Sequence, residues 1–204
     1  QFLKEIYLVR PSILDKYIDY LINSDSFSDH QEKHCCFFDL DDFVEIYNKI
    51  FEQLIRNRQY SRLSVPYFLE SLLLPKQNEK KLLERQDMWI RQCIQRFFND
   101  EAKMYCLFSV VSKLEFKRKK EYILLFLKNN SLFEDFEKIP LTPTSCSWSG
   151  SAVPMYSAWI EFLESLLPNF IGLKWIKHKN YIETKIDDLQ KQIEAEQIDE
   201  ILRG

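Results

Sequence analysis

Apolar side chains recur every three to four residues along most of this chain, which is the spacing of one face of an α-helix. The clearest case follows Asp39 and Asp41, either of which is a natural N-cap. There the helical period continues for more than three turns, at Phe43, Ile46, Tyr47, Ile50, Phe51, Leu54 and Ile55. These positions predict an amphipathic helix with one buried face.

The same period predicts helices along the rest of the chain, and prolines or polar pairs mark where several of them end. Pro75 and Pro168 each end a helix, and Asn99 with Asp100 separates two others. Residues 2–9 fit either an edge strand or the tail of a helix, and we adopt the helix interpretation. The other predicted helices cover residues 12–22, 66–74, 82–98, 104–111, 116–127, 155–167, 170–177 and 179–202.

No segment alternates polar and apolar residues between hairpin turns, so the predicted fold class is all-α. We expect an irregular helical array or an α-solenoid-like bundle of about seven to nine helices. No period of about 34 or 40 residues repeats, which argues against a regular tetratricopeptide or armadillo array. Residues 1–128 are predicted to form a helical region and residues 129–154 a proline- and serine-rich strap. Residues 155–204 are predicted to form C-terminal helices that pack on the first region as one structural unit.

Glycine is scarce, and its scarcity excludes several enzyme classes. The chain of 204 residues has only three glycines, whereas an average usage of about 7% predicts roughly 14. A dinucleotide-binding fingerprint, a phosphate-binding loop and a nucleophile elbow each need glycines at fixed offsets, so none of them is present. Hydrophobic residues make up 46% of the chain, which is ample material for a core.

The charge balance weighs against a dedicated nucleic-acid binder. The 28 Lys and Arg residues are offset by 31 Asp and Glu residues, for a formal net charge of −3, whereas such binders normally carry a basic excess. One local exception is the basic stretch Lys113–Lys120, with five Lys or Arg among eight residues. This stretch could contact the phosphates of a nucleic acid through Lys117, Arg118, Lys119 and Lys120. The alternative is that these side chains form a solvated helix face.

Cysteine spacing predicts neither a metal site nor a disulfide framework. The five cysteines match no zinc finger and no redox CxxC motif, so we expect reduced, mostly buried thiols and a cytoplasmic location. His30 and His34 are spaced for one helix face beside Cys35 and Cys36, and Cys146 lies in a polar loop. These residues leave a small enzyme or metal-binding domain as an alternative. The preferred interpretation has no catalytic residue, no metal and no cofactor.

The chain has no segment that predicts membrane insertion. No stretch approaches the roughly 18 uninterrupted apolar residues of a membrane span, and no basic-then-apolar signal segment is present. We therefore expect no membrane contact. The sequence starts at Gln1 rather than Met, from which we expect a piece of a longer or processed polypeptide.

The strap contains one residue that conflicts with its composition. Residues 139–154 hold three prolines and four serines, and Trp148 stands among them. Proline and serine keep the segment out of regular structure, whereas an exposed indole forfeits about 2–3 kcal/mol of transfer energy. We therefore expect Trp148 to be docked and its backbone ordered. The alternative is an exposed recognition element formed by Trp148, Ser149 and Gly150.

Part of the chain carries a resemblance to known proteins. The stretches that carry it are PLTPTSCSWSGSAVPMY, WIEFLESLLP and LKWIKHKNYIE, followed by an acidic helix. Over residues 122–202 the sequence resembles the C-terminal helical region of large bacterial signal-transducing ATP-binding proteins, of the kind associated with defence against phage. The resemblance implies a sensor or scaffold region. Any nucleotide chemistry would then belong to another part of the protein, because no Walker motif is present here.

These features predict a non-enzymatic helical interaction, scaffold or sensor region of a larger intracellular bacterial protein. Its surface is expected to bind a protein partner or the remainder of its own chain. Two rivals stay open at this point. One is a small enzyme or metal-binding domain that uses Cys146 or the pair His30 and His34. The other is a nucleic-acid contact module that uses Lys113–Lys120.

Overall fold

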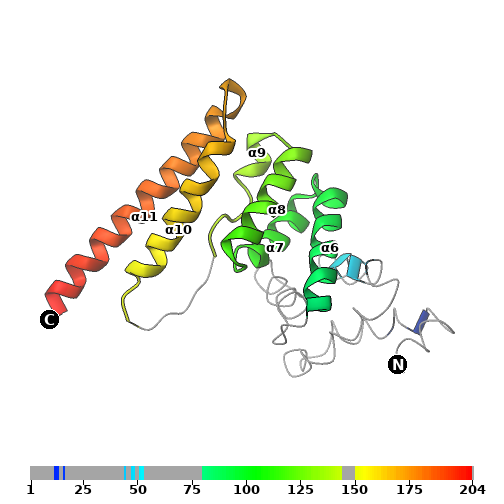
Figure 1. Cartoon of the computed structure of the whole chain (residues 1–204), viewed down its shortest axis with the longest axis horizontal. Helices are drawn as coiled ribbons and strands as arrows, with labels where there is room; N and C mark the ends of the chain where they lie inside the picture. Colours follow the sequence, from blue (N-terminus) through cyan, green and yellow to red (C-terminus); the bar gives the residue numbers. More distant parts are fainter. Residues whose placement is uncertain are drawn as a thin grey trace. The chain divides into compact units, whose positions relative to one another are not determined.

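The computed structural model describes residues 12, 13, 16, 44, 47, 48, 51, 52, 80–143 and 150–203. All regular structure in these residues is helical, which confirms the all-α class (Figure 1). The predicted total of seven to nine helices and the solenoid-like arrangement concern the whole chain and stay predictions. The helices are α6 (Lys80–Phe97), α7 (Glu101–Val111), α8 (Phe116–Asn129), α9 (Phe133–Phe136), α10 (Val153–Leu166) and α11 (Ile176–Arg203), with short 3-10 helices η3 (Leu167–Asn169) and η4 (Leu173–Trp175).

The chain divides into two compact units, residues 1–110 and residues 111–204. The first unit contains α6 and all but the last residue of α7, and the second contains α8 to α11. The second unit contains residues from all three regions that the sequence predicts, 1–128, 129–154 and 155–204. Those boundaries stay a prediction.

Aromatic side chains form the core of the first unit. Tyr47 and Phe51 lie one turn apart on helical residues and are fully buried, as the apolar stripe predicted. Their ring centroids lie 5.6 and 6.1 Å from that of Trp89 on α6, and Phe51 meets Phe97 edge to face at 6.0 Å. Each such pair adds about 0.5–1.5 kcal/mol beyond the area that it buries.

The predicted break between α6 and α7 is confirmed, and Asp100 explains it. The Asp100 carboxylate accepts a hydrogen bond from the backbone N–H of Lys103 at 3.1 Å. The backbone oxygen of Asp100 accepts one from the N–H of Met104 at 2.9 Å. Asp100 therefore caps α7 at its N-terminus, where the first N–H groups have no partner inside the helix.

In the second unit, α10 and α11 form an antiparallel hairpin, in which they run side by side (Figure 1). Pro154 lies in the first turn of α10, where its missing N–H is not needed. Gly172, in the turn between the two helices, has a φ of +93°, a conformation that glycine adopts without a steric penalty. The sequence predicts one apolar stripe along α11, at Ile182, Ile186, Leu189, Ile193, Ile198 and Ile201. Its first three members are buried, whereas Ile198 and Ile201 are exposed.

Contacts with the flanking helices complete the second unit. α8 packs against α10, and α9 packs against the start of α11. Among the helices of the described residues, none has both the length and the apolar character needed to cross a lipid bilayer.

Candidate functional site

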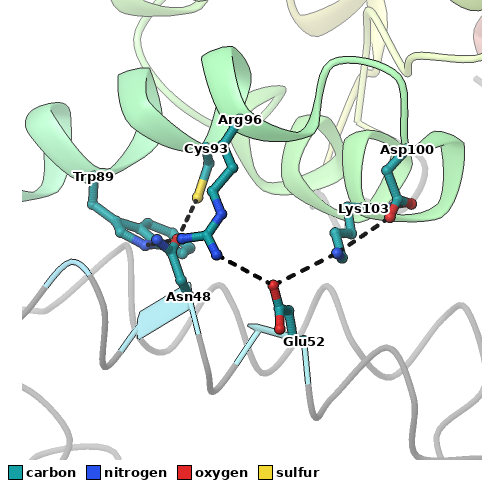
Figure 2. A network of polar contacts seen from close by, with 7 residues as sticks. All are labelled: Asn48, Glu52, Trp89, Cys93, Arg96, Asp100 and Lys103. Carbon is teal, nitrogen blue, oxygen red and sulfur yellow. Dashed lines mark hydrogen bonds and ion pairs between the residues drawn. The ribbon is translucent and has the colours of Figure 1, made fainter.

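A network of polar side chains lies beside the aromatic core of the first unit (Figure 2). The Asn48 side-chain oxygen accepts hydrogen bonds from the Trp89 indole N–H at 3.2 Å and from the Cys93 thiol at 3.5 Å. Burial raises the pKa of the Cys93 thiol well above its usual range, although Arg96 and Lys103 oppose the shift. Because a nucleophilic cysteine needs its thiolate form, the buried Cys93 thiol is poorly suited to nucleophilic attack.

Ion pairs extend the same network toward the surface. The Glu52 carboxylate lies 3.7 Å from the Arg96 guanidinium and 4.0 Å from the Lys103 ammonium, which in turn lies 3.2 Å from Asp100 (Figure 2). Partly exposed pairs of this kind contribute about 0–1 kcal/mol each. They connect residue 52 to α6 and α7 within the first unit.

The metal hypothesis finds no support in the described part of the chain. There, no three His, Cys, Asp or Glu side chains are grouped so that they can hold a metal ion. The candidate ligands and nucleophile are His30, His34, Cys35, Cys36 and Cys146, and they lie outside the described residues. Cys93 and Cys106 are buried and form no disulfide, as expected for these two.

Two cations of the basic stretch on α8 are engaged within the second unit. Lys119 is only 2% exposed. Its ammonium lies 5.1 Å from the ring centroid of Phe116 and 4.6 Å from that of Phe162, and these rings stack on each other at 5.4 Å. Burial lowers the pKa of Lys119 from 10.5 to about 8. Lys119 is therefore part of the contact between α8 and α10.

Its neighbour Lys120 donates a hydrogen bond of 2.7 Å to the backbone oxygen of Ser165. This oxygen lies in the last turn of α10, where the helix dipole favours a cation. Arg118 donates to the hydroxyl of Tyr122 at 3.2 Å, and Lys117 is exposed. Sequence alone treats these four cations alike, because which of them is buried depends on where α10 packs.

The structure describes one of the three candidate strap residues. Gly150 is exposed and has a φ of +88°, so it turns the chain shortly before α10. Trp148 and Ser149 lie outside the described residues, and the expectation that Trp148 is docked stays a prediction.

Four aromatic rings surround His178 at the start of α11, a cluster that sequence reasoning did not find. The ring centroids of Phe133, Phe136, Phe170 and Trp175 lie 5.5, 5.0, 5.7 and 4.7 Å from that of His178. His178 is 1% exposed, and neither ring nitrogen has a hydrogen-bond partner. Burial lowers the pKa of His178, against the opposing charge of Glu134. The neutral imidazole is therefore part of the core.

A pocket of about 370 Å³ lies in the second unit, between residues 140–143 and the α10–α11 hairpin. Its buried apolar lining consists of Leu141, Leu163 and Leu189. Trp159 of α10 and Tyr181 of α11 contribute half-buried aromatic side chains. The remaining lining residues are Pro140, Thr142, Pro143, Lys185, Asp188 and Gln192.

The Tyr181 side chain is held in place by contacts from a distant part of the sequence. Its hydroxyl donates to the backbone oxygen of Glu137 at 3.2 Å, and its ring contacts Phe133 and Phe136 at 5.9 and 6.0 Å. Burial raises the pKa of the Tyr181 phenol, and the Glu137 charge adds to the shift. Contacts within the protein thus fix the orientation of this aromatic ring, which lines the pocket.

The second exposed feature of the hairpin is the end of α11. α11 has 28 residues and α10 has 14, which correspond to about 42 and 21 Å at 1.5 Å per residue. The last turns of α11 therefore extend beyond α10 (Figure 1). Ile198, Ile201 and Leu202 in these turns are 59%, 79% and 80% exposed. Their i, i+3, i+4 spacing places them on one helix face, which we call the α11 end face.

Comparison with protein-family models, curated proteins and solved structures gives no match for this chain.

Proposed function

We propose that this chain is a non-enzymatic helical interaction module that binds a protein partner, or another part of a longer chain, through the α11 end face. The observation that carries the proposal is the exposure of three large apolar side chains on one face of a regular helix. Covering such side chains returns about 25 cal/mol for each Å² of apolar area removed from water. Contiguous exposed apolar surface of this kind marks interaction sites.

The charges beside the α11 end face indicate the chemistry of its partner. Glu194, Glu196, Asp199 and Glu200 lie among the last turns of α11. An amphipathic helix that carries Lys or Arg beside its apolar residues complements this surface in both shape and charge. A role as sensor or scaffold region of a larger bacterial protein, as the sequence resemblance implies, is part of the same proposal.

Site-specific photocrosslinking in cells tests the proposal directly. A photoreactive residue at position 201 should give one dominant adduct, either to a single protein or to one segment of a longer form of this chain. Replacing Ile198 and Leu202 by Ser should abolish that adduct, because the apolar contact is lost. Raising the salt concentration in a purified complex should weaken it, because exposed charge pairs are screened.

The matched control removes equally apolar side chains from the other end of the hairpin. Ile171 and Leu173 lie at the turn between α10 and α11 and are also strongly exposed. Replacing both by Ser should leave the adduct at position 201 unchanged. The proposal is wrong if position 201 gives no more adduct than position 171, or if the two Ser pairs have equal effects.

A further inference from the structure

The pocket on the hairpin has a fixed apolar interior. Leu163 is completely buried and Leu141 and Leu189 nearly so, while Tyr181 is oriented by its hydrogen bond to the backbone of Glu137. Ligand pockets typically measure about 300–1,000 Å³ and combine an apolar lining with a few polar groups. At about 370 Å³, this one lies near the lower limit, so it fits a ligand with a single small apolar or aromatic body.

The charges at the pocket determine which polar group such a ligand carries. Lys185 and Asp188 are both exposed lining residues. Asp188 is 3.9 Å from the ammonium of Lys191, whereas Lys185 has no carboxylate within ion-pair distance among the described residues. The ammonium of Lys185 instead lies 5.5 Å from the ring centroid of Tyr181.

This arrangement favours an anion over a cation. Aromatic rings beside a carboxylate are a common site for a ligand cation, but here Lys185 already lies over the Tyr181 ring and repels a second positive charge. Asp188 has a cationic partner in Lys191, whereas Lys185 has no carboxylate partner among the described residues, so Lys185 is the charged lining residue that is available to pair with a ligand. Thr142 and Gln192 add neutral hydrogen-bonding groups to the lining.

We propose that this pocket binds a small apolar monocarboxylate. The apolar body lies between Trp159 and Tyr181 over the buried leucines, and the carboxylate pairs with Lys185. The proposal is independent of the α11 end face and assigns no reaction to the pocket.

Three probes that share one apolar body test the charge and the place of binding in the complete chain. They are phenylbutyrate, its neutral amide, and phenylbutylamine. In nitrogen-15-labelled protein, phenylbutyrate should shift the indole N–H resonance of Trp159 and leave that of Trp175 in place. The amide should bind about fivefold more weakly, as expected for loss of one partly exposed ion pair, and the amine should bind most weakly.

Two charge variants test whether phenylbutyrate is attracted by Lys185 at the pocket or by any lysine on the surface of α11. Lys185→Gln should weaken phenylbutyrate binding to the level of the amide and leave amide binding unchanged. Lys179→Gln is the control, because Lys179 is an exposed lysine of the same helix that does not line the pocket. Lys179 pairs with Glu183 at 3.6 Å, and the variant should bind phenylbutyrate like the unaltered chain. Neither residue is buried, so both variants should fold.

Several results would overturn the proposal. One is that none of the three probes binds at millimolar concentration. Another is that the amine binds as tightly as the acid, which would assign the pocket to cations. A shift of Trp175 in place of Trp159, or equal losses in the Lys185 and Lys179 variants, would place the anion elsewhere on the protein.

Discussion

Replacing His178 by Phe should stabilise this protein, although it removes one of the most buried side chains of the second unit. A neutral imidazole carries one N–H donor and one acceptor nitrogen, and neither nitrogen of His178 has a partner. A buried polar group without a partner costs about 1–3 kcal/mol. Phe removes this cost and keeps an aromatic ring among Phe133, Phe136, Phe170 and Trp175.

The expected gain is about 1 kcal/mol in the free energy of unfolding at neutral pH, because the larger ring partly offsets the relief through tighter packing. Urea unfolding of the complete chain, followed by far-UV circular dichroism, measures it. His178→Ala is the matched comparison. It removes the unpaired nitrogens but also the ring contacts, so it should lower stability through the cavity that it leaves.

The pH dependence gives a second and independent readout. The folded-state pKa of His178 lies below its ordinary value of 6.5 because of burial, so below pH 6.5 the unfolded chain binds a proton that the folded chain does not. Above pH 6.5 the titration of His178 therefore does not change the free energy of unfolding. As the pH falls from 6.5 toward the folded-state pKa, the free energy of unfolding decreases. The Phe variant should lack this loss, and the comparison isolates His178 because His30 and His34 are unchanged. Parallel pH profiles together with a destabilised Phe variant would refute the burial of an unpaired imidazole.

Three further outcomes follow from buried polar groups. The free energy of unfolding of the wild type should rise relative to that of a Lys119→Met variant as the pH increases from about 8 toward 10.5, because the folded chain releases the Lys119 proton before the unfolded chain does; the titration of Cys93 acts on both proteins and cancels in this comparison of urea unfolding. Asn48→Ala should lower the free energy of unfolding by about 1–3 kcal/mol, because the Trp89 indole loses its buried acceptor, and in a Trp89→Phe background the same change should cost less. Iodoacetamide should alkylate Cys93 about tenfold or more slowly in the native protein than in urea, since burial keeps the thiol protonated; peptide mass spectrometry with equal rates in both states would contradict this.

Local periodicity was sufficient to predict α6, α7, α8, α10 and most of α11, but it missed the short helix α9, and residues 170–172 of the predicted helix at 170–177 are not helical. The stripe at Tyr47 and Phe51, the break at Asn99–Asp100 and the long helix up to residue 202 depend on neighbours within a few turns, and the structure confirms them. A helical period encodes which face is apolar, so these features are readable without knowledge of the partner helix. The burial of Tyr47 and Phe51 follows for the same reason.

The candidate sites were not predictable in this way, because each depends on residues far apart in sequence. Tyr181 is fixed by the backbone of Glu137, which lies 44 residues away. Lys119 and Lys120 look alike in sequence, yet one is buried against Phe162 and the other pairs with the backbone of Ser165. Which cation is buried follows from where α10 packs on α8, and the charge pattern of α8 contains no signal for it.

The pocket and the α11 end face lie on one helix, and their separation predicts that they act independently. Lys185, which pairs with the ligand, and Ile198 are 13 residues apart on α11, which is about 20 Å along the helix axis. Gln192, the pocket residue nearest to the end of α11, is about 9 Å from Ile198 along the axis. Sites separated by more than about 7–10 Å without shared contacts usually contribute additively. The Ser variant of Ile198 and Leu202 should therefore bind phenylbutyrate with the same affinity as the unaltered chain, measured from the shift of the Trp159 indole resonance. A weaker affinity in that variant would show that the last turns of α11 help to hold the pocket in shape, and the two sites would then have to be treated as one.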